Sequence, residues 1–226
     1  MVKARRRFFD AGHYNIIADQ IGSHLVDASA GCSEVSVLDA GCGEGMYLGH
    51  VQAALQGAGK QCKAFGVDVS KTAIRMAAKR HKEASFAVAS SYTLPFDNQV
   101  FEAVISVFAP VAAQEFARVL RRPGGILVVG YPGEQHLIEL KSLLYKQPKL
   151  FTEDSIPVAD LLSAGFEQRQ TVRVKQELTL TQEDALDLLG MTPFFWRAPE
   201  DITSQLTMEA GFKTTVDILL TAFMRA

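Results

Sequence analysis

The stretch that decides the fold is VSVLDAGCGEGMYLGHV, residues 35–51. A short apolar run ends at Asp39, glycines follow at alternate positions (Gly41, Gly43 and Gly45), and a helix-like segment then begins. Glycines in a strand-to-helix turn let backbone N–H groups approach a ligand closely. The stretch therefore predicts a small-molecule site at the carboxyl end of a strand.

Strands and helices alternate from this stretch to residue 132. Their apolar strands predict a parallel sheet with helices on both faces. Two long strands then follow, at 165–178 and 212–225, and they predict an antiparallel C-terminal pair. The earlier predicted strands are 34–40, 62–69, 84–90, 101–109 and 126–132, and the predicted helices are 2–29, 45–58, 70–81, 111–120 and 134–145.

The predicted architecture is α/β, a class I Rossmann-like fold with a mostly parallel seven-stranded sheet. We expect an N-terminal helical segment at 1–30 and the main domain at 31–226. An insert at 178–211 is expected to be part helix and part aromatic loop, and it would act as a substrate lid. Thr181 with Asp184 predicts a capping box at a helix start in this insert.

The spacing of the glycines distinguishes between ligands. A dinucleotide fingerprint would need a glycine at Met46, and a Walker A loop would need Gly-Lys-Ser/Thr. Asp39 can orient an amino-acid group, and Asp68, at the end of the next strand, can accept hydrogen bonds from ribose hydroxyls. A ribose and an amino acid without phosphate indicate S-adenosylmethionine, hence a class I methyltransferase. The loop expected to border the adenine carries Ser90, Ser91 and Leu94.

Composition limits the partners. The net charge is -2, so nucleic acid would have to bind at a local basic patch, of which Lys3, Arg5, Arg6 and Arg7 form the best candidate. Three cysteines without a CxxC pair predict a reducing, cytoplasmic setting and argue against a zinc site. There is neither an apolar run of membrane-spanning length nor a signal-peptide pattern, so we expect no membrane partner.

Several longer motifs resemble one family. ARRRFFDAGHYNIIADQI, VLDAGCGEGMYL, GVDVSKTAIRMAAKRH, FAVASSYTLPF, PGEQHLIELKSLLY and MTPFFWRA together resemble the RlmA-type 23S rRNA guanine-N1 methyltransferases, from about Lys3 to the C-terminus. The resemblance implies methyl transfer from S-adenosylmethionine to N1 of a guanine in a 23S rRNA hairpin, by a homodimer. It also implies cofactor contacts from Tyr14, Gly43, Glu44 and His136. Family members carry an N-terminal Cys-rich zinc ribbon, and this sequence begins after it.

The chemistry needs a base and an aromatic pocket. Guanine N1 carries a proton that a base or solvent must remove, and the candidates are Glu44, Asp10 and His136. A guanine taken out of a hairpin is commonly stacked on aromatic side chains. The residues predicted to meet the substrate are Phe108, Pro110, Phe194, Phe195 and Trp196, with Arg197 facing the nucleic acid.

Two alternatives remain open. A small-molecule methyltransferase on the same fold would use the aromatic insert as a lid and need no RNA-binding module. A non-catalytic S-adenosylmethionine-binding protein would bind the cofactor without transferring its methyl group, although the glycines with Asp39 and Asp68 argue against an inactive site.

Overall fold

The computed structural model describes residues 1–148, 150–151, 157–199, 201–207 and 210–226. The chain forms two compact units. The sheet unit comprises Ile17–Tyr131, Ile156–Val172 and Leu220–Ala226, and the aromatic unit comprises Met1–Ile16, Pro132–Ser155 and Arg173–Leu219. The predicted division into 1–30 and 31–226, with a lid at 178–211, stays a prediction, and residues 200 and 208–209 of that insert lie outside the described residues.

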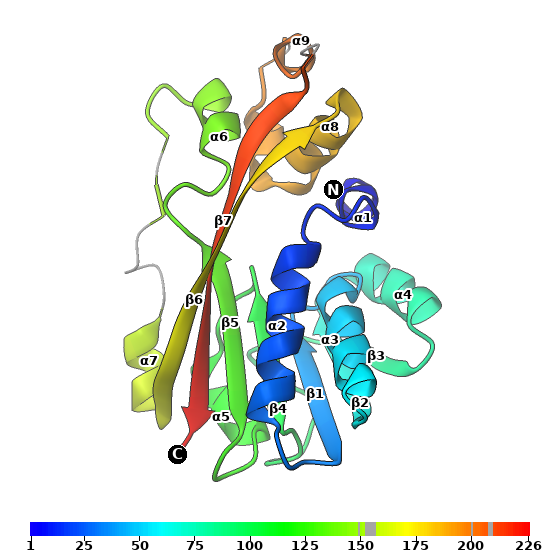
Figure 1. Ribbon diagram of the computed structural model, residues 1–226, viewed down its shortest axis with the longest axis vertical. Coiled ribbons are helices and arrows are strands. Elements are labelled where there is room, and N and C mark those ends of the chain that lie inside the picture. The colour runs from blue at the N-terminus through cyan, green and yellow to red at the C-terminus, as the bar shows by residue number, and fades with distance from the viewer. Residues whose placement is uncertain (149, 152–156, 200, 208–209) are drawn as a thin grey trace. The chain divides into compact units, whose positions relative to one another are not determined.

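A seven-stranded sheet has the order β3-β2-β1-β4-β5-β7-β6 (Figure 1). Strands β1 to β5 are parallel, and β6 and β7 run antiparallel to each other. This confirms the predicted mostly parallel sheet with an antiparallel C-terminal pair. The strands are β1 (Glu34–Ala40), β2 (Gln61–Asp68), β3 (Ala84–Val88), β4 (Ala103–Val107), β5 (Ile126–Pro132), β6 (Phe166–Leu180) and β7 (Phe212–Arg225).

The helices start and stop largely where the sequence signals them. Ser70 caps α4 as predicted, since its hydroxyl accepts a hydrogen bond from Ala73 N–H at 3.2 Å. Thr181 caps α8 and accepts from Asp184 N–H at 3.1 Å. The helices are α1 (Val2–Asp10), α2 (Asn15–Ala28), α3 (Met46–Gly57), α4 (Lys71–Arg80), α5 (Ala113–Val119), α6 (Ile138–Leu144), α7 (Val158–Ser163), α8 (Gln182–Met191), the 3-10 helix η2 (Pro193–Arg197) and α9 (Ile202–Gln205).

Two predicted helices need correction. The single helix expected over 2–29 is broken into α1 and α2 because Gly12 adopts a φ of +82°, which a right-handed helix does not allow. The helix expected over 134–145 begins only at Ile138, since Leu137 has a φ of +55°. The preceding residues therefore form a loop instead of a first helical turn.

The order of the strands places a ligand site. Strands β2 and β3 follow β1 on one side of the sheet, and strands β4 and β5 lie on the other side of β1. The carboxyl end of β1 is thus a topological switch point, where sheets of this kind bind ligands. Strand β4 is buried along all five residues, which makes this part of the sheet a rigid support.

Candidate active site

The glycine loop joins β1 to α3 in the sheet unit. Gly41, Gly43 and Gly45 all have positive φ, at +91°, +54° and +79°. A side chain at Gly41 would collide with Ala109, and one at Gly45 would lie 3.0 Å from the ring of His81. The loop therefore requires glycine for backbone conformation and for packing as well as for close approach of a ligand.

Asp68 organises this loop from the end of β2. Its Oδ2 accepts a hydrogen bond from Gly43 N–H at 2.9 Å, and its Oδ1 accepts from Ser70 N–H at 2.8 Å. Each carboxylate oxygen can accept more than one bond, so ribose hydroxyls remain suitable partners. The ribose role stays a prediction, but the structure adds the task of holding the loop.

Asp39 is a buried acid at the end of β1. It is 1% exposed, and its Oδ2 has no hydrogen-bond partner among the described residues. Burial, helped by the negative charge of Asp68, raises the pKa of Asp39 to about 8. A buried carboxyl with one oxygen free beside a glycine loop suits a cationic ligand group, so the site fits the ammonium of S-adenosylmethionine.

The other predicted cofactor residues of the sheet unit lie in two loops. Glu44 is buried within the glycine loop, and Ser91 is buried in the loop after β3. Ser90 Oγ accepts from Tyr92 N–H at 3.2 Å and is thus used within its own turn. Leu94 is also buried, as a residue bordering an adenine would be.

Arg118 and Glu115 of α5 hold the loop after β3, which the sequence did not reveal. Glu115 Oε2 accepts from Leu94 N–H at 2.7 Å. Arg118 donates to Leu94 O at 3.1 Å and to Phe96 O at 2.7 Å, and it pairs with Glu115. Arg118 lies 22 and 24 residues from these two carbonyls in sequence, so only the fold brings it to this loop.

Phe108 and Pro110 follow β4, next to β1. Both are exposed, and Phe108 adopts a φ of +54°, which is rare for a bulky residue. Its N–H donates to Gly130 O at 2.9 Å, which holds this strained backbone in place. Both groups are exposed near the switch point, and their contact with the substrate stays a prediction.

His136 and Tyr14 lie together in the aromatic unit. Their ring centroids are 6.4 Å apart, and both residues are buried. His136 Nδ1 accepts the N–H of Asp217 at 3.3 Å, which leaves the proton of the neutral ring on Nε2. Burial, and then the charge of Lys141, lowers the pKa of His136 to about 3, so the ring is neutral at physiological pH.

The loop that carries His136 is anchored by Asp217 of β7. This buried carboxylate accepts two hydrogen bonds from Arg173, both at 2.7 Å, and one from Gln135 N–H at 2.9 Å. A Cβ on Gly133 would lie 2.6 Å from the same carboxylate, so glycine is required there. Side chains distant in sequence thereby set the position of His136.

The predicted substrate aromatics lie on η2, also in the aromatic unit. Trp196 is 81% exposed and Phe195 48%, and their rings meet at 5.4 Å. Phe194 instead packs on Tyr145, with ring centroids 6.0 Å apart. Arg197 is exposed on the same short helix. Three side chains, from Phe195 to Arg197, are therefore available to a partner, and their substrate role stays a prediction.

The N-terminal basic run is partly used within the protein. Arg7 donates to Asp187 of α8 at 2.7 Å, and Arg6 lies 3.6 Å from Asp10. Asp10 is thus a surface carboxylate with a neighbouring arginine. Lys3 and Arg6 remain exposed for contact with phosphate.

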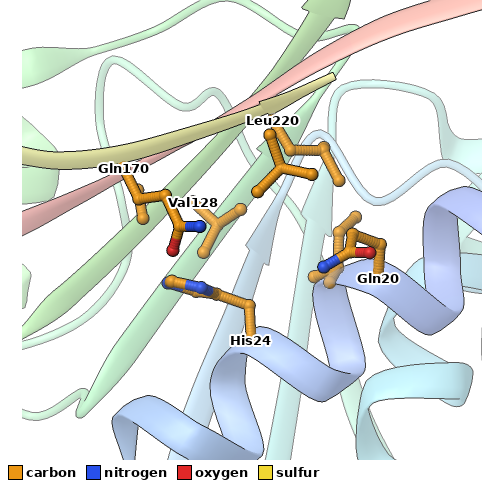
Figure 2. Close-up of a pocket in the computed structure, with 8 residues that line it drawn as sticks. Gln20, His24, Val128, Gln170 and Leu220 are labelled. Atoms are coloured by element: carbon orange, nitrogen blue, oxygen red, sulfur yellow. The ribbon is translucent and has the colours of Figure 1, made fainter. Parts of the chain in front are cut away.

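A small pocket of the sheet unit has none of these residues in its lining. It lies between α2 and strands β5, β6 and β7 (Figure 2). Its lining includes the polar residues Gln20, His24 and Gln170 and apolar residues such as Val128 and Leu220. None of its lining residues was predicted as a site residue. Among the described residues there is no cluster of three or more His, Cys, Asp or Glu side chains suited to a metal, and no helix long and apolar enough to cross a membrane.

Comparison with known proteins identifies similar methyltransferases. Residues 37–125 match a family model described as "Methyltransferase domain". The chain is 32% identical over 219 residues to YxjB of Bacillus subtilis (strain 168), named as a candidate 23S rRNA guanine-N1 methyltransferase, with 96% of this chain and 77% of that protein covered. It is 29% identical over 231 residues to the 23S rRNA (guanine(748)-N(1))-methyltransferase of Streptomyces fradiae, with 98% and 78% covered.

A solved structure agrees with the fold. A SAM-dependent methyltransferase from Thermotoga maritima has a TM-score of 0.56 at 17% identity, with 100% of this chain and 96% of that chain covered. At this identity the likeness shows the fold alone. It is the fold predicted from the glycine stretch and the strand order.

Proposed function

Because the chain belongs to the family of 23S rRNA guanine-N1 methyltransferases, we propose that it transfers the methyl group of S-adenosylmethionine to N1 of a guanine in a 23S rRNA hairpin. The protein is an S-adenosylmethionine-dependent methyltransferase. The proposal concerns the atom and the nucleic acid that receive the methyl group. A homodimer and a cytoplasmic location remain predictions.

The extent of the similarity carries the proposal. The methyltransferase family model matches only residues 37–125, which belong to the sheet unit. The similarity to YxjB covers 96% of the chain and therefore includes most of the aromatic unit. Since substrate choice depends on the parts outside the cofactor-binding sheet, a shared aromatic unit supports a shared acceptor.

The sheet unit is suited to hold the donor. S-adenosylmethionine supplies an activated methyl group on a sulfonium, so the protein has mainly to position donor and acceptor. In this proposal Asp39 pairs with the ammonium of the cofactor, and Asp68 accepts from its ribose. Gly43 and Gly45 keep the loop backbone open, and Ser91 lies beside the adenine.

The aromatic unit is suited to hold the acceptor. A base extracted from a hairpin loses its stacking neighbours, and an aromatic side chain replaces them. Phe195 and Trp196 are exposed aromatic groups on η2, and Arg197 adds a positive charge beside them. Stacking on such a side chain contributes roughly 1–3 kcal/mol per base.

The deciding experiment uses 23S rRNA that lacks the modification. The purified chain is incubated with labelled S-adenosylmethionine, and the RNA is then read by reverse transcription, which N1-methylguanine arrests. Label in the RNA with one cofactor-dependent stop is the expected result. Label in a small-molecule fraction would favour the small-molecule alternative, and cofactor binding without transfer to either would favour a non-catalytic binder.

A further inference from the structure

Lys141 is a buried lysine whose amine forms no hydrogen bond with the part of the chain that the structure describes. It lies on α6, is 2% exposed, and its Nζ has no hydrogen-bond acceptor among the described residues. Its Nζ lies over the ring of Phe151, 4.2 Å from the ring centroid. A ring face attracts a cation, but it replaces little of the lost hydration.

The rest of the same segment has clear tasks. Gly133 makes room for Asp217, and Gln135 donates to that carboxylate. Glu139 accepts from Thr215 N–H and from its hydroxyl, both at 2.7 Å. Hydrogen bonds to β7 thus account for Gln135 and Glu139, whereas the amine of Lys141 makes none with the described residues.

The position of Lys141 connects two predicted functional groups. His136 lies five residues before it, in the loop that precedes α6. The charge of Lys141 lowers the pKa of His136, so the two side chains interact electrostatically. One turn after Lys141 lies Tyr145, which packs on Phe194 of η2. Along the chain, Lys141 therefore lies between His136, a predicted cofactor contact, and Tyr145, which packs on the helix η2 that carries the exposed aromatic residues.

We propose that Lys141 is the catalytic base that removes the N1 proton of the guanine. This rests on the proposed function, because only an acceptor nitrogen that carries a proton needs such a base. A guanine ring would take the place over Nζ that the Phe151 ring occupies in the ligand-free protein, since both present a flat π face.

The step balances in atoms and charge. The lone pair of the neutral amine takes the N1 proton, and the electrons of the N–H bond stay on N1. N1 then forms a bond to the methyl carbon of S-adenosylmethionine, while the carbon–sulfur bond breaks and its electron pair goes to sulfur. The products are N1-methylguanine, S-adenosylhomocysteine and a lysine ammonium, which returns its proton to water.

The titration of Lys141 suits this task. Burial lowers its pKa to about 8, so a useful fraction of the amine is neutral near pH 7.5. Lys141 interacts by charge with His136, whose pKa it lowers. His136 accepts a hydrogen bond from Asp217 N–H, and Asp217 pairs with Arg173. His136 is less suitable as the base because its Nδ1 already accepts a backbone N–H, and Asp10 lies on the surface beside Arg6.

The test is the pH dependence of RNA methylation for wild type, Lys141→Met and Lys141→Arg. Lys213→Met is the matched control, since Lys213 is an exposed lysine of the same unit that pairs with Glu177. For wild type and the control, kcat/KM should rise to a plateau with a midpoint near pH 8. Both Lys141 variants should lose that midpoint and be slower by about 100-fold, the usual effect of losing an acid–base group.

Cofactor binding and folding are measured alongside. Lys141→Met keeps the volume and removes a buried charge, so its melting temperature should not fall. Its affinity for S-adenosylmethionine by calorimetry should stay within about twofold of wild type. If Lys141→Met keeps the pH midpoint and the methylation rate of wild type, the inference is overturned and the proposed function stands. The same conclusion follows if the pH midpoint is lost in Glu44→Gln and in neither Lys141 variant. Failure of wild type to methylate RNA would overturn both.

Discussion

Asp39→Asn should stabilise the ligand-free protein while weakening cofactor binding. The carboxyl is 1% exposed, and burial together with the charge of Asp68 raises its pKa to about 8, from an ordinary value of 3.8. Between these two values the folded protein binds more protons at this group than the unfolded chain does. The free energy of unfolding therefore falls as pH rises through this window.

The size of the effect follows from the linkage. Each pH unit inside the window costs about 1.4 kcal/mol, so wild type should lose up to about 3 kcal/mol at this group between pH 5 and pH 7.5. Asparagine has the same shape and no proton to lose. The variant should match wild type near pH 4 to 5, within about 1 kcal/mol, and exceed it increasingly up to pH 8.

The assay is urea unfolding followed by circular dichroism, because the single tryptophan, Trp196, is 81% exposed and reports poorly on the core. Asp97→Asn, at an exposed carboxylate, is the matched control and should follow wild type at every pH. Calorimetry should show weaker binding of S-adenosylmethionine by Asp39→Asn. A stability difference that does not change with pH, or a variant that unfolds more easily at pH 8, would refute the reasoning.

Three other changes test separate parts of the molecule. Asp68→Ala removes an acceptor for the N–H groups of Gly43 and Ser70 as well as for the ribose. The binding free energy of the cofactor, measured by calorimetry, should weaken by about 1.5–3 kcal/mol, and an unchanged affinity would contradict the assignment. Trp196→Ala should spare cofactor affinity but lower turnover on RNA, whereas Leu162→Ala, at an exposed apolar residue of α7 in the sheet unit, should lower neither; equal turnover would mean that Trp196 is only a surface residue. Asp217→Asn should destabilise the protein by about 3 kcal/mol in urea, because Arg173 loses the charge of a fully buried partner, and a loss below about 1 kcal/mol would show that the ion pair is dispensable.

Local patterns in the sequence were sufficient for the sheet and the glycine loop. Continuous apolar runs bounded by glycine and polar residues predicted β1, β4 and β5 to within a few residues, because a strand buried on both faces needs apolar side chains throughout. The two long strands β6 and β7 were predicted from their length and position near the C-terminus, although most residues of β6 are exposed. The glycine spacing with Asp39 and Asp68 indicated the ligand, since these features lie within or next to single turns. The longer motifs indicated the family, which the relatives confirm.

Backbone breaks were harder to foresee. Gly12 interrupts an otherwise helical pattern, and its positive φ depends on how the chain turns between α1 and α2. Leu137 adopts a left-handed conformation that leucine rarely takes, because the loop before it is tied to Asp217. Propensity describes one residue at a time and does not contain such distant ties.

The sequence by itself determined the class of fold, the family and the residues beside the glycine loop, since these depend on side chains close together along the chain. Only the tertiary structure decided the protonation of Asp39, the tautomer of His136 and the burial of Lys141. Proton affinity depends on dehydration and on charges brought together from distant segments. His136 and Asp217, for example, are 81 residues apart in sequence and joined by one hydrogen bond.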